Sequence, residues 1–509
     1  MPRARSLRAQ AWLPFAALIS ALALGACTVG PDYHAEAAPT PTAYKELKGW
    51  KVATPAEGPG GGDWWALYRD AALDTLIKQV EISNQNVAVQ AAAYEQARAV
   101  IRQAQASLFP LLTASYSATE QHFGSARAAG GASSVSGVVS RSGYVQTYNP
   151  ALNGTWDLDI WGKVRRQIES NTSAAQASAA DLAYVKLSQQ ALLATAYFNL
   201  RTADALRDLL DRTVAIYRES QRITQDKVNA GCCVAPLQPV SPADLALAKA
   251  LVETTQAQAI NVGVQRAQYE HAIAMLIGRP PAELTVAHRS LGRGPIPNIP
   301  VAVPSSLLER RPDIAQAERT MQQYNALIGV AIAGYFPDIS LSGSLEWIGN
   351  HPLPFNVASE IWSLGASGTQ ILFNGGLTGA QVDQARAQYW QFVATYRQTV
   401  LTAFQGVEDQ LAAIRILTRQ LVVVHKAVVD ARDAVRIYQD QYRAGTVDFT
   451  TVITGEAQLL VDEEAELTVR QNLFLASVNL IEDLGGGWDT NLLPKQNELV
   501  KGFSLLPRL

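Results

Sequence analysis

One stretch of the sequence, from Val407 to Tyr442, constrains the fold more than any other. Its apolar residues recur at steps that alternate between three and four, which is the seam of a coiled-coil helix. The helical pattern extends from Leu377 to Ala444, so we predict a rod about 100 Å long at roughly 1.5 Å per residue. A rod of that length does not fit inside a globular core and indicates an extended assembly. The seam consists of Val407, Leu411, Ile414, Leu421, Val424, Val428, Ala431, Val435, Tyr438 and Tyr442, interrupted only by Thr418.

The rod occurs twice, because the chain is a tandem duplication. The ten residues from Arg222, RITQDKVNAG, match the ten from Arg436, RIYQDQYRAG, at an offset of 214. Similar landmarks recur at an offset of 227 upstream and 207 downstream. These are Phe109–Pro110 with Phe336–Pro337, and Ile277–Gly278 with Leu484–Gly485. An internal repeat fixes the architecture, so each copy is expected to hold the same elements.

The N-terminus has the parts of an exported lipoprotein leader. Three arginines precede an apolar segment, Ala11–Leu24, that is too short to span a bilayer comfortably. A Leu-Gly-Ala-Cys tetrapeptide ending at Cys27 resembles a bacterial lipobox. We therefore predict a signal peptide over 1–26, a covalent lipid on Cys27, and an extended Pro- and Gly-rich tether over 27–63. Thr28 follows the cysteine instead of an aspartate, which in such lipoproteins implies outer-membrane sorting. The alternative is an ordinary signal peptide that happens to contain Cys27.

Composition argues against several function classes. The formal net charge is −3 and only 17% of the residues are charged, so no broad basic surface for nucleic acid is expected. The 6 histidines show no metal-ligand spacing. The sequence also has no Gly-x-Ser-x-Gly or Walker-type loop, so we expect neither an enzyme nor a metal or other cofactor.

Strand-like alternation appears once in each copy. From Leu152 to Ile160 apolar residues alternate with polar ones, and Ile339–Trp347 repeats the pattern. Asp157 and Asp159 fall on the polar face, which would line a lumen. A water-soluble sheet packed on helices explains the alternation too, but aromatic residues near the strand ends favour a membrane barrel.

We expect each copy to contain one β-hairpin, which gives four strands per chain. Four strands cannot close a barrel with a lumen, because the smallest membrane barrels need 8 strands. Open edges in lipid would leave backbone groups unsatisfied. We therefore expect several chains to pool their strands in a cyclic homo-oligomer.

The chain divides into repeats and linkers. In each copy we expect a helix, a hairpin, a long rod and a return helix. The first helix runs from about Ala71 to Ser107, and the return helices run from Pro242 to Leu276 and from Phe449 to Leu484. The predicted units are a first repeat over 64–278, a Pro-rich linker over 279–304, a second repeat over 305–488 and an irregular tail over 489–509.

The mature chain resembles the TolC-like outer-membrane efflux proteins, in particular the lipidated NodT-type subfamily. The resemblance rests on Cys27–Tyr33 (CTVGPDY), Arg310–Ile314 (RRPDI), Phe336–Leu341 (FPDISL) and the Ala444–Gly445 turn. It implies a homotrimer with an outer-membrane β-barrel, four strands from each chain, continuous with a long periplasmic α-helical barrel. It also implies passive conduction of small molecules delivered by a periplasmic adaptor and an inner-membrane RND-type pump. The tips at Gly231, Ala444 and Gly445 would contact the adaptor.

The resemblance further implies a gate at the periplasmic tip. In the family an aspartate, often with a tyrosine three residues before the turn glycine, constricts the closed channel. Asp244 matches the aspartate and Tyr442 the tyrosine, while Thr451 stands where a second acid would be. The alternative role of Asp244 is a helix N-terminal acid after Pro242, and the two roles are compatible.

Other functions stay open at this point. A type I secretion duct or a metal-efflux duct would carry the same architecture. A periplasmic coiled-coil adaptor or structural lipoprotein would explain the helices, but it does not require two hairpins with apolar faces. The adjacent Cys232 and Cys233 fit either free thiols or a strained vicinal disulfide in an oxidising compartment.

Overall fold

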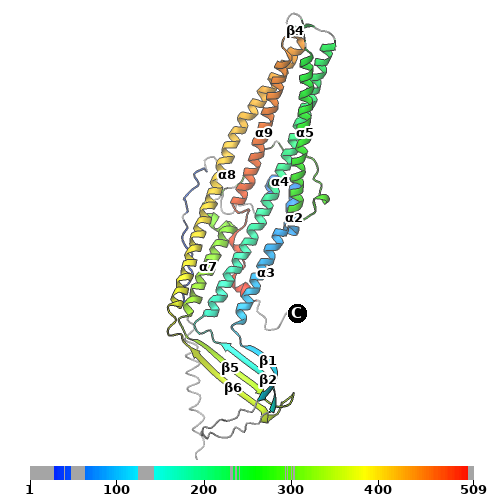
Figure 1. Cartoon of the computed structure of the whole chain (residues 1–509). Coiled ribbons are helices and arrows are strands. Elements are labelled where there is room, and N and C mark those ends of the chain that lie inside the picture. The colour runs from blue at the N-terminus through cyan, green and yellow to red at the C-terminus, as the bar shows by residue number, and fades with distance from the viewer. Residues whose placement is uncertain are drawn as a thin grey trace, which may run out of the picture.

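The computed structural model of the chain is elongated, with helices packed side by side along most of its length and a sheet at one end (Figure 1). It describes residues 28–38, 40–46, 63–123, 143–229, 233–234, 238–239, 241–292, 294, 296–299, 301 and 304–501. Two predicted residues, Cys27 and Gly231, lie outside these ranges. Among the helices that the described residues form, none combines the length and apolarity needed to cross a membrane.

The predicted duplication is present in the order of the elements. The first copy contains α2 (Ala71–Ser83), α3 (Gln85–Ala106), β1 (Leu111–Phe123), β2 (Gly143–Asp157), α4 (Lys163–Asn229) and α5 (Pro242–Leu276). The second contains α6 (Leu307–Arg310), α7 (Pro312–Ala333), β5 (Asp338–Trp347), β6 (Glu360–Thr369), α8 (Leu377–Ala444) and α9 (Phe449–Asp483). The smaller elements are η2 (Trp64–Tyr68), β3 (Cys233–Val234), β4 (Gln238–Pro239), η3 (Pro281–Glu283), η4 (Pro304–Ser306), η5 (Val357–Ser359), η6 (Thr490–Leu492) and α10 (Gln496–Val500).

The long helices confirm the coiled-coil prediction. Helix α8 spans 68 residues with the predicted bounds, and α4 spans 67. Every residue of the predicted seam is buried or half-buried. Helices α5 and α9 lie beside the tip halves of these rods, and α3 and α7 lie beside their sheet-proximal halves (Figure 1). The burial of the seam shows that helix-on-helix packing holds the rods together.

The predicted single helix from Ala71 to Ser107 is wrong, because it is interrupted at Asn84. This residue is extended, with ψ 125°, and its side chain accepts the backbone N–H groups of Asn86 and Val87. An asparagine at this position starts a new helix instead of continuing the old one, since its side chain competes for the backbone donors.

The four long strands form one antiparallel sheet in the order β1-β2-β5-β6. Directly opposed residues share a face of the sheet. One row of opposed residues runs from Ala114 through Leu152 and Leu345 to Trp362, and all four are apolar. The next row lies on the other face and runs through Thr113, Asn153, Ser344 and Ser363, which are all polar. The predicted separation into an apolar and a polar face is therefore confirmed in these two rows.

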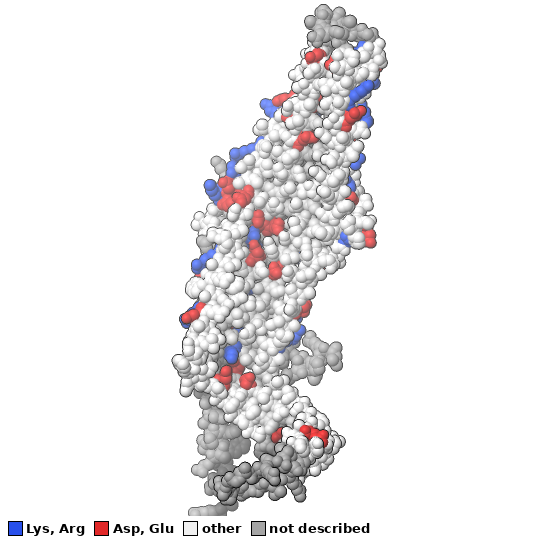
Figure 2. Space-filling model, viewed as in Figure 1, with Lys and Arg blue, Asp and Glu red and all other residues white. Residues whose placement is uncertain are grey.

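The sheet has two open edges. In the described residues β1 pairs only with β2, and β6 pairs only with β5. On the side shown in Figure 2 the sheet is mostly uncharged, whereas charged side chains are scattered along the helices. On β6, Leu364 is 81% exposed and Trp362 is 67% exposed. An apolar face with free edges needs a partner or a lipid environment to cover it.

The segment after Cys27 is held at the junction of sheet and helices. Arg166, whose side chain is 5% exposed, donates to the carbonyl oxygens of Val29 and Gly30 and to the carboxylate of Asp32. Gly30 has a φ of 102° and lies so close to Gly329 that a Cβ on it would be 2.4 Å from that residue's Cα. These contacts give a physical reason for the glycine and the aspartate of the CTVGPDY pattern.

Candidate functional site at the helical tip

The tip of the second copy is a tight turn between α8 and α9. Gly445 adopts a φ of 79°, and Thr446 N–H donates to the Gln441 carbonyl oxygen at 2.9 Å. A left-handed glycine with this bond is the usual way to end a helix. Ala444 is the last residue of α8, so the predicted contact residues Ala444 and Gly445 do form the turn.

Tyr442 lies at the centre of the tip. Its side chain is buried, and its phenolic oxygen lies 3.1 Å from the hydroxyl oxygen of Thr224 on α4. The ammonium group of Lys227, also on α4, lies 3.7 Å from the centre of the ring. The ring packs against Phe449 of α9 with centroids 5.7 Å apart. Burial raises the pKa of Tyr442, the Thr224 hydroxyl opposes this rise, and the Asp244 carboxylate adds to it.

These contacts make Tyr442 a bridge between the two helical hairpins of one chain, joining α8 to α4. Sequence reasoning found Tyr442 but missed Thr224 and Lys227. The repeat carried no signal for them, since the position equivalent to Tyr442 in copy one is Val228.

Asp244 lies in the first turn of α5 and forms a capping box with Ser241. Its carboxylate accepts the backbone N–H of Ser241 at 2.9 Å, while the Ser241 hydroxyl accepts the N–H of Ala243 at 3.1 Å. The helix-capping role considered for Asp244 is thus present in the structure. Its part in a gate stays a prediction.

The second copy also pairs a carboxylate with a hydroxyl group at the start of its return helix, but here the acid comes first in the sequence. Asp448 caps α9, and its carboxylate accepts both the backbone N–H and the hydroxyl of Thr451, at 2.9 and 2.5 Å. The hydroxyl of Thr451 holds the pKa of Asp448 below its usual range. Asp448 stands where Ser241 stands in copy one, and Thr451 where Asp244 stands. The acid that the sequence analysis expected at Thr451 is therefore three residues earlier, and the offset of 207 could have revealed it.

A groove runs between α8 and α9 at this end. Its volume is about 500 Å³, and its lining includes Tyr438, Asp448, Thr451, Thr454 and Gly455. A Cβ at Gly455 would lie 2.8 Å from the Tyr438 ring. The missing side chain therefore lets the two helices approach at the groove.

The two residues predicted to face a lumen differ in their surroundings. Asp157 is the last residue of β2, lies opposite Ser340 on the polar face and is exposed. Asp159 lies beyond the strand, which ends at Asp157, three residues before the end of the alternating pattern at Ile160. Its carboxylate accepts the backbone N–H groups of Val164 and Arg165 at 2.9 and 3.0 Å and is 9% exposed. Asp159 therefore caps α4, and the contact of either carboxylate with a lumen stays a prediction.

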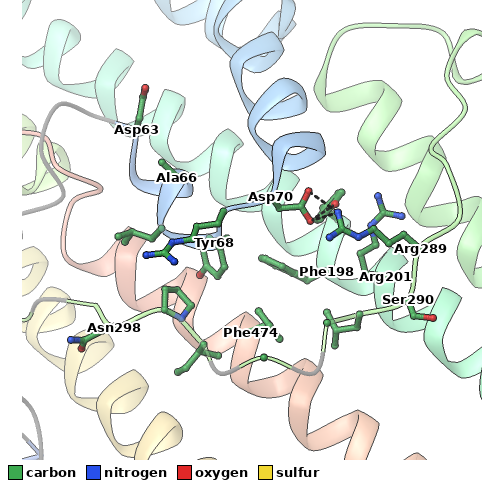
Figure 3. Close-up of a pocket in the computed structure, with 18 residues that line it drawn as sticks. Asp63, Ala66, Tyr68, Asp70, Phe198, Arg201, Arg289, Ser290, Asn298 and Phe474 are labelled. Carbon is green, nitrogen blue, oxygen red and sulfur yellow. Dashed lines mark hydrogen bonds and ion pairs between the residues drawn. The ribbon is translucent and has the colours of Figure 1, made fainter.

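A separate cavity of about 810 Å³ lies away from the tip, between η2, α4, α9 and the Pro-rich linker over 279–304 (Figure 3). Its central acid is engaged within the chain: Asp70 caps α2, accepts the Tyr197 hydroxyl at 2.8 Å and faces Arg289 at 3.4 Å. Tyr68, Phe198 and Phe474 form its aromatic wall. None of the residues predicted from the sequence lines it. The described residues also contain no group of three or more His, Cys, Asp or Glu arranged to hold a metal.

Comparison with known proteins shows the same architecture in a known family. The family described as "Outer membrane efflux protein" matches residues 76–279 and 303–486. The antibiotic efflux pump outer membrane protein ArpC of Pseudomonas putida is 30% identical over 481 residues, covering 92% of this chain and 94% of ArpC. The cation efflux system protein CusC of Escherichia coli O6:H1 is 26% identical, covering 94% and 98%.

Among solved structures, the outer-membrane channel OprN superposes with a TM-score of 0.77. It is 29% identical, and the match covers 91% of this chain and 100% of that one. The chain therefore belongs to the outer membrane efflux protein family: it is an outer-membrane channel of an efflux system and not an enzyme.

Proposed function

We propose that the chain works as a homotrimer whose sheets join edge to edge into one barrel in the outer membrane. The observation that carries this proposal is the four-stranded sheet with one apolar face and unpaired edges on β1 and β6. Three copies pairing β6 with a neighbour's β1 would satisfy every edge, as lipid requires. The apolar face would then meet lipid, and the polar face with Asp157 would line the lumen.

The helical rods would continue this barrel through the periplasm. In the proposal the tips, including Gly231, Ala444 and Gly445, meet a periplasmic adaptor joined to an inner-membrane RND-type pump. The groove between α8 and α9 supports a helical partner, because residues of two neighbouring helices line it. The channel itself is passive, and the pump supplies the energy.

We assign the gate to the bridge at Tyr442 together with Asp244 and Thr451. Opening requires α8 and α9 to move away from α4, which breaks the contact between Tyr442 and Thr224. The charge of Asp244 contributes to the raised pKa of Tyr442, which supports placing the acid in the same gate.

The N-terminal part of the proposal is a signal peptide over 1–26 and a lipid on Cys27. Residues 28–33 support it, since Arg166 fixes them beside the sheet, where an acyl chain would enter the membrane. We further propose the unit boundaries 64–278, 279–304, 305–488 and 489–509. For the cargo, similarity to ArpC favours small organic molecules, and similarity to CusC makes cation export the second candidate.

Two measurements on the purified full-length product test the proposal. Detergent-corrected mass should give three chains per particle, and a stable monomer would contradict the pooled barrel. Intact mass should show the loss of residues 1–26 and added acyl groups. A mature chain with an unmodified Cys27, or one that begins elsewhere, would contradict the lipid anchor. Cross-linking from Ala444→Cys to a co-expressed adaptor, compared with Ile82→Cys on the exposed surface of α2, tests the tip contact.

A further inference from the structure

A buried carboxyl group lies next to the tip bridge. Glu456 of α9 is only 3% exposed. One of its oxygens, Oε1, accepts the Ser220 hydroxyl of α4 at 3.0 Å and the Gln439 amide of α8 at 2.8 Å. Ser220 is one helical turn from Thr224, and Gln439 is one turn from Tyr442. Glu456 therefore joins α4, α8 and α9 about one helical turn from the contact between Tyr442 and Thr224.

The second oxygen of this group is isolated. Glu456 Oε2 is buried and has no hydrogen-bond partner among the described residues. A buried carboxylate that lacks partners is costly, and protonation removes that cost. Burial accordingly raises the pKa of Glu456, while the bonds from Gln439 and Ser220 oppose the rise.

The groups around Glu456 do not supply a compensating positive charge. On α4 it faces Tyr217, whose pKa is raised chiefly by burial and further by Glu456 and Glu464. On α8 it faces Gln439, and no lysine or arginine of the described residues forms a salt bridge with it.

Three cations at this end of the rods have other partners. Lys227 lies over the Tyr442 ring, one layer closer to the tip. Arg443 pairs with Asp440, and Arg222 pairs with Glu219. Within α9 the neighbouring turns present the buried Val452 and Leu459.

We propose that Glu456 is a proton-linked latch of the tip: in its protonated form it holds α4 against the α8–α9 hairpin, and loss of the proton favours opening. This inference rests on the proposed gate and names its regulation. When the latch opens, each chain releases one proton from Glu456 to water. The closed tip raises the affinity of the Glu456 carboxyl group for its proton, so the latch holds fully at low pH. It weakens as the pH rises through the raised pKa of Glu456.

Single-channel recording in planar bilayers across a pH series tests the latch. For the unmodified channel we expect the open-to-closed ratio to rise with pH, by up to about tenfold per pH unit for each proton released. Glu456→Gln keeps the size of the side chain and cannot ionise, so this dependence should disappear and the channel should stay mostly closed. Glu253→Gln, on the exposed surface of α5, is the matched control and should behave like the unmodified channel.

A second variant tests the same idea without replacing Glu456. Ser220→Ala removes the hydrogen bond through which Glu456 holds α4, so the channel should open more easily across the whole pH series while its pH dependence persists. Difference infrared spectroscopy separates a carboxylic acid from a carboxylate and should show a band that titrates with opening and is absent in Glu456→Gln.

Two results would overturn the latch: the same pH dependence in Glu456→Gln as in the unmodified channel, or a Glu456 band that is already ionised where the channel is closed. Failure of the gate itself would look different. In that case Tyr442→Phe would leave conductance unchanged at constant pH, whatever Glu456 does.

Discussion

The side-chain amide of Asn84 donates to the carbonyl oxygen of Leu276 at 2.7 Å, joining the start of α3 to the end of α5. In the second copy the guanidinium of Arg311 donates to the carbonyl oxygen of Asp483 at 2.6 Å, joining α7 to α9. The first members of the two pairs are 227 residues apart and the second members 207, which are the offsets of the sequence repeat. Each copy therefore has the same junction, in which two short helices meet end to end beside a rod.

The junction of the second copy contains the charged Arg311, so substitution there should lower stability more than at Asn84 in the first copy. Arg311 also forms two bonds with the Asp313 carboxylate, at 3.0 and 2.8 Å, and its side chain is 10% exposed. Arg311→Met would leave two partly buried carboxylates unpaired, so we expect a loss of about 3 kcal/mol of stability. Thermal unfolding of the purified trimer should show this, with Arg419→Met, exposed on α8, as the control. Equal melting temperatures for both variants would contradict this account of the RRPDI motif.

The two faces of the sheet should tolerate charge differently. Leu364 lies in the middle of β6 on the apolar face, and Ser363 beside it lies on the polar face. If the apolar face meets lipid, Leu364→Arg should cost about 2–4 kcal/mol per chain near the bilayer midplane. Ser363→Arg should cost much less, because its side chain would point to water.

Reversible unfolding in lipid vesicles measures this difference. The trimer must be confirmed for each variant by detergent-corrected mass. Similar losses for Leu364→Arg and Ser363→Arg would contradict the assignment of the faces.

The bridge between Tyr442 and Thr224 should hold the tip closed. Tyr442→Phe keeps the ring, and with it the contacts to Lys227 and Phe449, but removes the hydroxyl. A hydrogen bond of this kind contributes about 0.5–1.5 kcal/mol, so the open-to-closed ratio should rise roughly 2- to 10-fold. Single-channel recording at constant pH measures the ratio. Tyr438→Phe, one turn earlier on α8, is the control, and an equal response from it would mean that the bridge is not specific.

Asp244 combines a structural bond with a charge, and two substitutions separate them. Asp244→Asn retains an oxygen that can accept the Ser241 N–H, so α5 should keep its first turn. If three Asp244 carboxylates converge on the channel axis, this variant should conduct more and be blocked less by multivalent cations. Ser241→Ala weakens the cap without changing the charge, so it should leave the block unchanged. Unaltered conductance and block in Asp244→Asn would leave Asp244 as a helix cap alone.

Much of the fold follows from patterns that the sequence repeats. The seam of α8 and the alternation from Leu152 to Trp156 depend on spacing, which the sequence displays directly. The break at Asn84 is a local cap that the sequence analysis missed, whereas the bond that fixes the Asn84 amide to the Leu276 carbonyl oxygen could not be read from the sequence, because the two residues are far apart in it. Thr224 and Glu456 were missed for the same reason, since their roles arise only where α4, α8 and α9 pack together.

Acid should act on the tip through two carboxyl groups with opposite effects, and the first of these is Asp448, which caps α9. The ionised Asp448 accepts two bonds from Thr451, so its removal should loosen the first turn of α9. Losing such a cap costs about 1 kcal/mol, or roughly a fivefold faster amide exchange. Hydrogen exchange measured by mass spectrometry on peptides from the start of α9 should show this for Asp448→Ala. Asp440→Ala, which breaks an exposed pair with Arg443, should not show it.

The pH dependence of this cap has the opposite sign to that of Glu456. Because the native pKa of Asp448 is lowered, its contribution is complete at neutral pH and is lost as pH falls through that lowered value. After correction for intrinsic exchange rates, amides at the start of α9 in the unmodified protein should exchange in acid nearly as fast as they do in Asp448→Ala. The region around Glu456 should meanwhile become better protected, since protonation strengthens that latch. Protection that falls together at both places, in the unmodified protein and in Glu456→Gln alike, would show that acid acts on the tip as a whole and not through these two carboxyl groups.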